Sequence, residues 1–379
     1  MSTWPLLLIL VTVALFSLPL IPGLIELLRP TDIKPLSVSQ AYDNNPFFFA
    51  EGFRSYIARE FGDIHSAQNH NGRLADGTKY QLVGEKGMPN LDASNVTAKL
   101  LLSAHPLTLP AGELFEMEVY GKQAVLTGER SHFRALLSEN TLHIRDHCTI
   151  IRWAHSNGEM AVGRQSKLFG RATSNHSIVL GDGVQFERLH APRVLTTSAG
   201  NGAPPAPKMQ LTELRELPDV KIHGGRRWVL NGGMTFPANY AFDGDIVTSA
   251  GAAIGDNAHI KGSIKCNATN DASYRAKDHN SINRAEKDSA RCELGNRVRI
   301  DGSVVSTNDL YIGQYCQIMG PVIAEGLLVI GAGTVIGSPE LPTTVTAPRI
   351  IIEAGCTIYG TVWAEEGGIV RTSQEVIAA

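Results

Sequence analysis

Apolar residues return along this chain at intervals of eighteen residues. The repeat starts at Ile144, Val162, Leu180, Phe236, Ile254, Leu294, Ile312, Ile330 and, four residues late, Ile352. An apolar residue follows each start six positions later, and in seven rungs another follows ten positions later, so these offsets are even. Because successive side chains of a β-strand point to opposite faces, even offsets place the apolar side chains on one face. The pattern predicts an all-β fold, a parallel β-helix solenoid of about eighteen residues per rung around one continuous core.

Two further columns of the repeat support this fold. Glycine occurs eight positions after the start in six rungs, which predicts a bend there. Mostly small residues occur four positions after the start, in the column Cys148, Ser166, Val184, Tyr240, Ala258, Val298, Cys316, Thr334 and Cys356. The chain has five cysteines and no CxxC pair, so they are predicted to be reduced thiols packed in a narrow core, in a reducing compartment. No metal site and no cofactor site are predicted.

The N-terminus carries a long apolar segment. From Trp4 to Ile25, twenty-two residues contain no charged side chain, which is enough to cross a bilayer core. The segment lacks the basic start and the small-residue cleavage site that are typical of a signal peptide. Arg29 and Lys34 follow it, and the positive-inside tendency then places the bulk of the chain in the cytoplasm. Residues 1–30 are therefore predicted to be a single-pass transmembrane anchor.

Residues 31–105 lack the repeat and are predicted to be irregular and partly helical. A candidate helix begins near Asn45–Pro46 and carries Phe47, Phe48, Phe49, Phe53 and Ile57. We expect this helix to cap the end of the solenoid, or else to lie on the membrane surface.

The β-helix is predicted to span residues 106–370, with a short tail at 371–379. Three segments break the period, at 191–235, 267–291 and 338–349. In a solenoid, insertions leave the rungs as surface loops and often carry function. We therefore expect these three inserts to be loops on the surface.

Basic and acidic residues nearly balance, with 34 Lys and Arg against 37 Asp and Glu, for a net charge of -3. This balance does not favour a nucleic-acid partner. The candidate catalytic bases are scattered histidines, namely His147, His155, His176, His190, His223, His259 and His279. None of them lies in a catalytic motif, and no catalytic residue is predicted.

Three aspartates and the run Arg226–Trp228 are possible binding residues, and each also has a structural interpretation. Asp243, Asp245 and Asp301 lie at predicted corners, where aspartate accepts backbone hydrogen bonds. The run Arg226–Trp228 could bind a phosphate or a lipid headgroup, or could serve for stacking and surface cover.

Residues 236–265 and 294–364 resemble the rungs of bactofilins, which are bacterial polymer-forming cytoskeletal proteins. Bactofilin rungs alternate an IDGxV unit with an IGxxxxIxGxVxA unit, and Ile300–Val304 and Ile312–Ala324 carry matching strings. Residues 105–190 share only the period. The resemblance implies a right-handed triangular β-helix that stacks end to end into filaments. It also implies a scaffold at the bacterial inner membrane that localises cell-envelope proteins or polysaccharide-synthesis machinery.

Two enzymatic alternatives remain open. Hexapeptide-repeat acyltransferases also use eighteen residues per turn and would act on an envelope precursor, with a histidine as the base. Only two of the three aliphatic sites per turn comply here, because Ser156, Thr248 and Ala324 belong to a column of small residues. A β-helical polysaccharide-active enzyme would need paired carboxylates or a bound calcium ion, and the pattern does not bring acids together.

The last rung is predicted to be a self-association surface. A solenoid must cover the open stack of its final rung, and only about fifteen residues follow Ala364. We therefore expect Ile358, Val362 and Trp363 to meet the matching rung of a second copy.

Overall fold

The computed structural model describes residues 4–18, 21, 45–64, 67–91, 95–197, 211–214, 221–223, 226–267 and 291–371. The chain forms two compact units, Met1–Asn45 and Pro46–Ala379. The first contains helix α1 (Trp4–Ser17), whose 14 residues are apolar except for Thr12 and Ser17. Within the described ranges, no helix combines the length and the apolar character that a membrane span requires. The transmembrane anchor at residues 1–30 stays a prediction.

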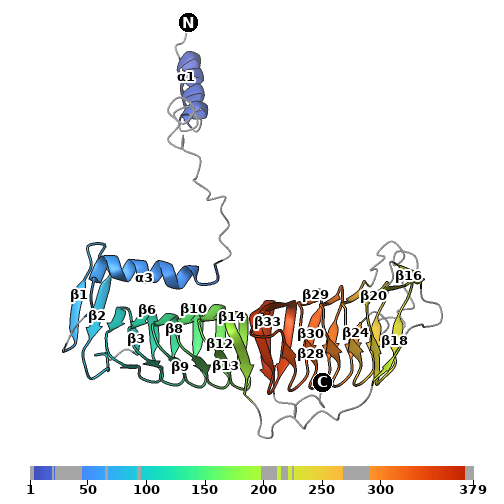
Figure 1. The fold of residues 1–379 in the computed structure, drawn as a ribbon. Helices are drawn as coiled ribbons and strands as arrows, with labels where there is room; N and C mark the ends of the chain where they lie inside the picture. The colour runs from blue at the N-terminus through green and yellow to red at the C-terminus, as the bar shows by residue number, and fades with distance from the viewer. Residues whose placement is uncertain are drawn as a thin grey trace. The chain divides into compact units, whose positions relative to one another are not determined.

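The second unit is a parallel β-solenoid of about 13 turns, spaced about 18 residues apart (Figure 1). Its N-terminal half is formed by β1 (His70–Arg73), β2 (Lys79–Val83), β3 (Val96–Thr97), β4 (Leu100–Ser103), β5 (Leu107–Thr108), β6 (Leu114–Gly121), β7 (Val125–Leu126), β8 (His132–Ser138), β9 (Leu142–Ile144), β10 (Thr149–Ser156), β11 (Met160–Val162), β12 (Lys167–Ser174), β13 (Ile178–Leu180) and β14 (Gln185–Thr196). The all-β solenoid predicted from the repeat is confirmed.

The C-terminal half follows the same design. Its strands are β15 (Thr212–Glu213), β16 (Lys221–His223), β17 (Arg227–Leu230), β18 (Met234–Phe236), β19 (Tyr240–Phe242), β20 (Asp245–Thr248), β21 (Ala252–Ile254), β22 (His259–Ile260), β23 (Ile264–Cys266), β24 (Cys292–Leu294), β25 (Arg299–Ile300), β26 (Val304–Ser306), β27 (Leu310–Ile312), β28 (Gln317–Ile318), β29 (Val322–Ala324), β30 (Leu327–Ile330), β31 (Val335–Ile336), β32 (Thr343–Glu353) and β33 (Thr357–Arg371).

Strand register reproduces the sequence period. Val162 pairs with Leu180 between β11 and β13, and Ile300 pairs with Ile318 between β25 and β28. Both pairs are eighteen residues apart, and all four side chains are buried. Identical columns therefore stack rung on rung, and the apolar side chains form one continuous core along the unit.

The glycine column reflects close stacking of the backbone. A Cβ atom on Gly320 would lie 2.7 Å from the carbonyl carbon and oxygen of Gly302 in the preceding rung. Since such contacts are too short, a larger residue at Gly320 would force the two rungs apart.

A hydrogen-bonded corner recurs at the small-residue column. The residue before it adopts positive φ, as at Gln165 (54°) and Tyr315 (56°). This turn leaves a buried N–H and a buried carbonyl to be satisfied. Thr334 Oγ1 accepts from Cys316 N at 3.2 Å and donates to Gly313 O at 3.0 Å. Ser166 serves the N-terminal half in the same way.

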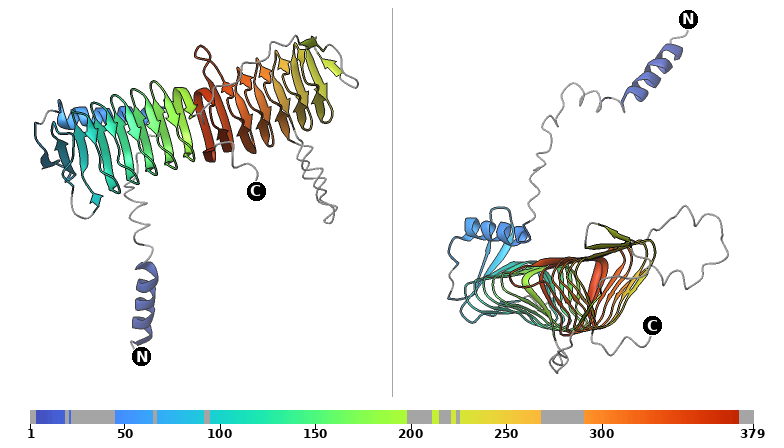
Figure 2. Two further views of the ribbon diagram at one scale, coloured as in Figure 1. Left: turned by 90° about the horizontal axis from the view of Figure 1, so that it is seen from below. Right: turned by 45° about the vertical axis from the view of Figure 1, so that its right-hand side comes forward.

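Helix α3 (Phe48–Phe61) lies along the side of the N-terminal half (Figures 1 and 2). Ala50 and Ile57 are buried against side chains of β4, β6, β8 and β10. The predicted helix is confirmed, but its expected role as an end cap is wrong, because its apolar face covers the strands of several successive rungs. Region 31–105 is also more regular than expected, since β1 to β4 lie within it.

Short antiparallel pairs cover the two far ends of the solenoid. At one end β1 pairs with β2, which continues in parallel with β4. At the other end β16 pairs with β17. There Trp228 is buried and stacks on Phe242, with ring centres 3.8 Å apart. The interpretation of Trp228 as a stacking residue is confirmed.

The two halves run toward each other and meet in the middle of the unit (Figures 1 and 2). The last strand of the N-terminal half, β14, pairs antiparallel with β33, the last strand of the chain. The β-helix predicted for residues 106–370 is thus built from two stacks that run in opposite directions. A repeat of eighteen gives the number of residues in each rung. It does not give the direction in which successive rungs stack.

The described parts of the predicted inserts differ from simple surface loops. Segment 191–235 contains the end of β14 and the strands β15 to β17, and it takes the chain to the far end of the unit. In segment 338–349, strand β32 begins at Thr343, so the excursion is short. Apart from Asn267 and Arg291, segment 267–291 lies outside the described residues.

Candidate functional site

The predicted self-association residues lie in the junction between the two halves. Ile358 pairs with Val194, and Val362 pairs with Leu189. Both Ile358 and Val362 are buried, because β14 of the same chain covers them. The prediction that this rung is open is wrong. The last rung in the sequence is not the last rung in space, because β14 packs on it.

Trp363, the third predicted residue, lies at the outer surface of the junction. It is 39% exposed and pairs with Arg188 across the two strands. The guanidinium carbon of Arg188 lies 4.1 Å from the Trp363 ring centre, which is cation–π geometry. Trp363 is therefore accessible, but on the side of the rod.

The junction also carries a polar contact between its two strands. His190 Nδ1 and Thr361 Oγ1 are 2.8 Å apart. Burial lowers the pKa of His190, and the nearby charge of Arg171 lowers it further. The lowered pKa favours the neutral imidazole, which packs between the two strands of the junction.

His155 is the other candidate base that the structure draws into the solenoid. It is fully buried, its Nδ1 lies 2.8 Å from Thr173 Oγ1, and burial lowers its pKa to about 4. The ring of Phe47 contacts both His155 and His190 edge to face. These two histidines anchor the start of helix α3, which is a structural role.

The remaining histidine candidates lie apart from this pair. His147 occupies a positive-φ corner, His176 contacts the Ser177 hydroxyl, and His223 belongs to β16. His259 lies 2.8 Å from a carboxylate oxygen of Asp301. His279 lies outside the described residues. The structure therefore places these side chains at separate points along the unit.

The acidic candidates at the corners are engaged with basic neighbours. Asp243 and Asp245 pair with Arg226 and Arg227, at 3.1 Å and 3.4 Å. Burial alone would raise the pKa of Asp301, but its hydrogen bonds with Arg299 and His259 outweigh burial and hold that pKa below its usual value. These contacts fit the stabilising role expected of corner aspartates.

The cysteines occupy the core as predicted. Cys316 and Cys356 donate hydrogen bonds to carbonyls of the preceding rung, and burial raises the pKa of their thiols to about 11 and about 12. Cys266 on β23 and Cys292 on β24 are also buried. The raised pKa values make the thiols of Cys316 and Cys356 poor nucleophiles at neutral pH.

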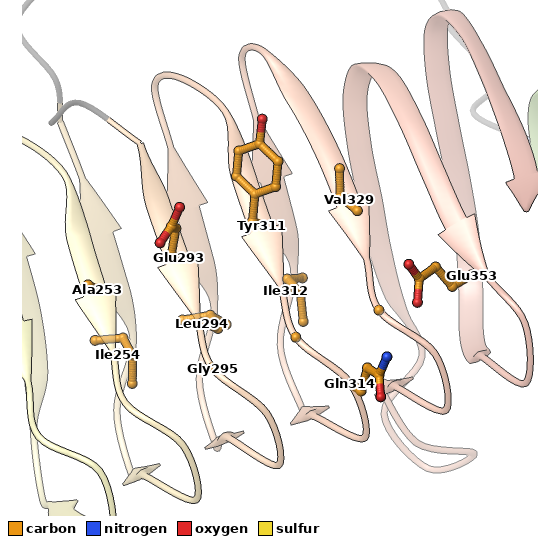
Figure 3. A pocket seen from close by; sticks show the side chains of 12 residues that line it. Ala253, Ile254, Glu293, Leu294, Gly295, Tyr311, Ile312, Gln314, Val329 and Glu353 are labelled. Carbon is orange, nitrogen blue, oxygen red and sulfur yellow. The ribbon is translucent and has the colours of Figure 1, made fainter. Parts of the chain in front are cut away.

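A shallow groove of about 340 Å³ crosses the outer face of the C-terminal half (Figure 3). Glu293, Tyr311 and Val329 follow one another on β24, β27 and β30, and Gln314 and Glu353 lie at one side. Glu293, Tyr311 and Val329 are at odd offsets in the repeat, and such positions point away from the core. The apolar pattern gave no signal for them, because outward positions vary freely from rung to rung.

Polar side chains of this groove form ion pairs and hydrogen bonds with neighbouring residues. Arg291 forms an ion pair with Glu293 at 2.5 Å, and its guanidinium carbon lies 5.4 Å from the Tyr311 ring centre. Burial and the Asp309 carboxylate raise the pKa of Tyr311. Glu353 accepts a hydrogen bond from Ala332 N. The groove is therefore a surface of mixed polar and apolar side chains.

Two further grooves, of about 380 Å³ and about 300 Å³, lie at the junction and share Glu187. Within the described part of the chain, no three His, Cys, Asp or Glu side chains gather as a metal site. Comparisons with protein-family models, with curated proteins and with solved structures found no match. The resemblance to bactofilins therefore depends on the rung strings alone.

Proposed function

We propose that this protein is a non-enzymatic scaffold, in which a rigid β-solenoid is held at a membrane by the N-terminal apolar segment. The observation that supports this best is the continuity of the solenoid across the β14–β33 junction, which joins two short solenoids into one rod. A rod of about 13 turns holds its outer residues at fixed spacings, as a platform for partner proteins requires.

The bactofilin-like rungs direct this proposal to the bacterial cell envelope. On this basis the solenoid is right-handed, faces the cytoplasm, and localises cell-envelope proteins or polysaccharide-synthesis machinery. Any association between copies would use surfaces other than Ile358 and Val362, since β14 covers these residues.

The groove of Figure 3 is the face that we assign to a partner protein. A photo-reactive amino acid at Tyr311 of the full chain, expressed in its own cells, should give a discrete covalent adduct. The same amino acid at Gln317, which is exposed on another strand of the same half, is the matched control. Adducts of equal yield at both positions, or at neither, would contradict this assignment.

Topology is tested separately. A reporter fused after Ala379 should be active only as a cytoplasmic reporter, because Arg29 and Lys34 follow the apolar segment. Alkaline phosphatase activity at that position would refute the orientation. An acyl donor bound in a crystal with a histidine at its thioester would overturn the non-enzymatic assignment and favour the acyltransferase.

A further inference from the structure

Basic and aromatic side chains alternate on the outer surface of the junction. The guanidinium carbon of Arg171 lies 5.7 Å from the ring centre of Phe49, and that of Arg188 lies 4.1 Å from the ring centre of Trp363. Arg171 is in register with Arg188, and Arg188 with Trp363. Neighbouring strands are about 4.8 Å apart, so the two guanidinium groups come from adjacent rungs.

This surface carries positive charge on a chain of slightly negative net charge. The two junction grooves are together lined by five arginines, Arg152, Arg171, Arg188, Arg349 and Arg371, and by three glutamates, Glu187, Glu365 and Glu366. Two of the glutamates are already engaged. Glu187 accepts a hydrogen bond from Gly170 N, and Glu366 pairs with Arg349 at 3.7 Å.

Large apolar side chains surround these arginines and are open to solvent. Phe49 is 47% exposed, Ile151 is 48% exposed and Phe169 is 41% exposed. Phe49, Phe169 and Trp363 line the same grooves as the arginines, and Ile151 precedes Arg152 on β10. We call Phe49, Arg152, Phe169, Arg171, Arg188 and Trp363 the junction patch.

The junction patch lies where the chain enters the folded unit. Arg171 donates a hydrogen bond to the carbonyl of Pro46, the first residue of that unit, at 3.1 Å. The apolar segment that we propose as a membrane anchor precedes Pro46 by about twenty residues. This length of chain allows the patch to reach the surface of the same bilayer.

We propose that the junction patch binds the surface of an anionic lipid bilayer. Aromatic rings favour the headgroup level of a membrane, and each arginine adds electrostatic attraction to acidic lipids. Because rings and guanidinium groups alternate, one face offers both the aromatic contact with the headgroups and the electrostatic attraction. The inference deepens the proposed function and rests on its membrane attachment, since it gives the solenoid a second contact with the membrane that would hold one side of the rod against it.

The folded unit by itself allows the patch to be tested without the apolar segment. Both hydrophobic clusters of the structure consist of residues from Ala50 onward, so residues 46–379 retain the whole core. This fragment should sediment with vesicles of phosphatidylcholine and phosphatidylglycerol, and not with vesicles of phosphatidylcholine alone. Binding should fall as sodium chloride is raised, because salt screens exposed charges.

Substitutions then locate the contact. Arg152→Gln with Arg188→Gln should weaken the partition coefficient about thirty-fold, at roughly five-fold for each arginine. The matched control is Arg145→Gln with Arg164→Gln, which removes the same charge at another corner of the same half and should bind almost as well as the unchanged fragment. Because Arg188 also stacks on Trp363, Arg152→Gln alone is the second variant. Arg152 forms no ion pair within the described residues, so this variant should keep its fold and lose about five-fold.

The outcomes separate the patch from the anchor. Absence of binding by the fragment, equal binding to neutral vesicles, or an equal loss in the control variant would overturn the patch. Stronger displacement by inorganic phosphate than by sodium chloride of equal ionic strength would indicate a free-anion site and would overturn it as well. The proposed anchor fails in a different experiment, if the unchanged full chain leaves the membrane fraction of its own cells after washing with high salt.

Discussion

The hydroxyl of Thr196 completes the corner of the rung that contains Cys356, although the two residues are 160 positions apart. Cys356 N donates to Thr196 Oγ1 at 2.9 Å, and Thr196 Oγ1 donates to Glu353 O at 2.7 Å. Thr334 makes the same two contacts two rungs earlier, with Cys316 N and Gly313 O. Thr196 therefore takes the corner position of the next rung, even though its strand runs in the opposite direction. The ladder of corners continues across the junction.

Replacing Thr196 with valine should destabilise the junction. Valine has nearly the same shape but leaves Cys356 N and Glu353 O without their partner, and unpaired buried groups cost about 1–3 kcal/mol. The free energy of unfolding, measured by urea titration, should fall by that amount. Thr344→Val is the control, because Thr344 is exposed on β32 and its replacement should change stability by less than about 0.5 kcal/mol. Equal effects of the two substitutions would argue against the corner role of Thr196.

A disulfide should form across the junction within one chain. His190 and Thr361 are paired, and paired Cα atoms of antiparallel strands are about 4.5–5.5 Å apart, which suits a disulfide. The double variant His190→Cys with Thr361→Cys should migrate faster than the reduced protein on a denaturing gel, as a cross-linked monomer. In the control, His190→Cys with Thr344→Cys, the positions are two strands apart, at about 9.6 Å, and should not bond. A cross-linked dimer would show that β14 pairs with β33 of another chain.

Stability should decrease in mildly acidic solution because of His155. Burial lowers the pKa of this histidine to about 4, from an ordinary value of 6.5. Between these values the unfolded chain binds more protons than the folded chain, so the free energy of unfolding rises with pH. His155 therefore contributes its full stability above pH 6.5, and up to about 3 kcal/mol is lost as the pH falls to 4. The lowered pKa of His190 acts in the same direction.

Urea midpoints between pH 4.5 and pH 7.5 measure this dependence. His155→Gln cannot titrate and should flatten the slope, whatever its effect on stability at neutral pH. His143→Gln, at an exposed position of β9, should leave the slope unchanged. A slope that His155→Gln does not alter would show that this ring is not the group that titrates.

Helix α3 should detach from the solenoid when Ile57 is truncated. Ile57 is 3% exposed, and Ile57→Ala should weaken the docking of the helix by about 2–5 kcal/mol. Hydrogen exchange should then be faster in α3 and in the strands below it, with little change in the C-terminal half. Phe48→Ala is the control, since Phe48 is 59% exposed. If both variants exchange alike, the helix is not held by its buried face.

The β-solenoid was determined by the sequence alone, because its period is a local property. Every rung repeats the same short-range rule, with apolar side chains at even offsets such as Ile300 and Val304, glycine where rungs approach closely, and small residues such as Cys316 at the corner. These residues pack against the same column one rung away. No knowledge of distant contacts is needed to place them in a core.

The direction of each half, and what covers its last rung, was decided only by the tertiary structure. Antiparallel and parallel strands present the same alternating faces, so Val362 stacks as well on Leu189 of the opposing half as it would on a rung of a second copy. Within the junction patch, Trp363 comes from the C-terminal half, and it meets Arg188 of β14 only because the two halves run toward each other. A local repeat cannot predict this contact, because the contact depends on where the segment between the two halves leads the chain.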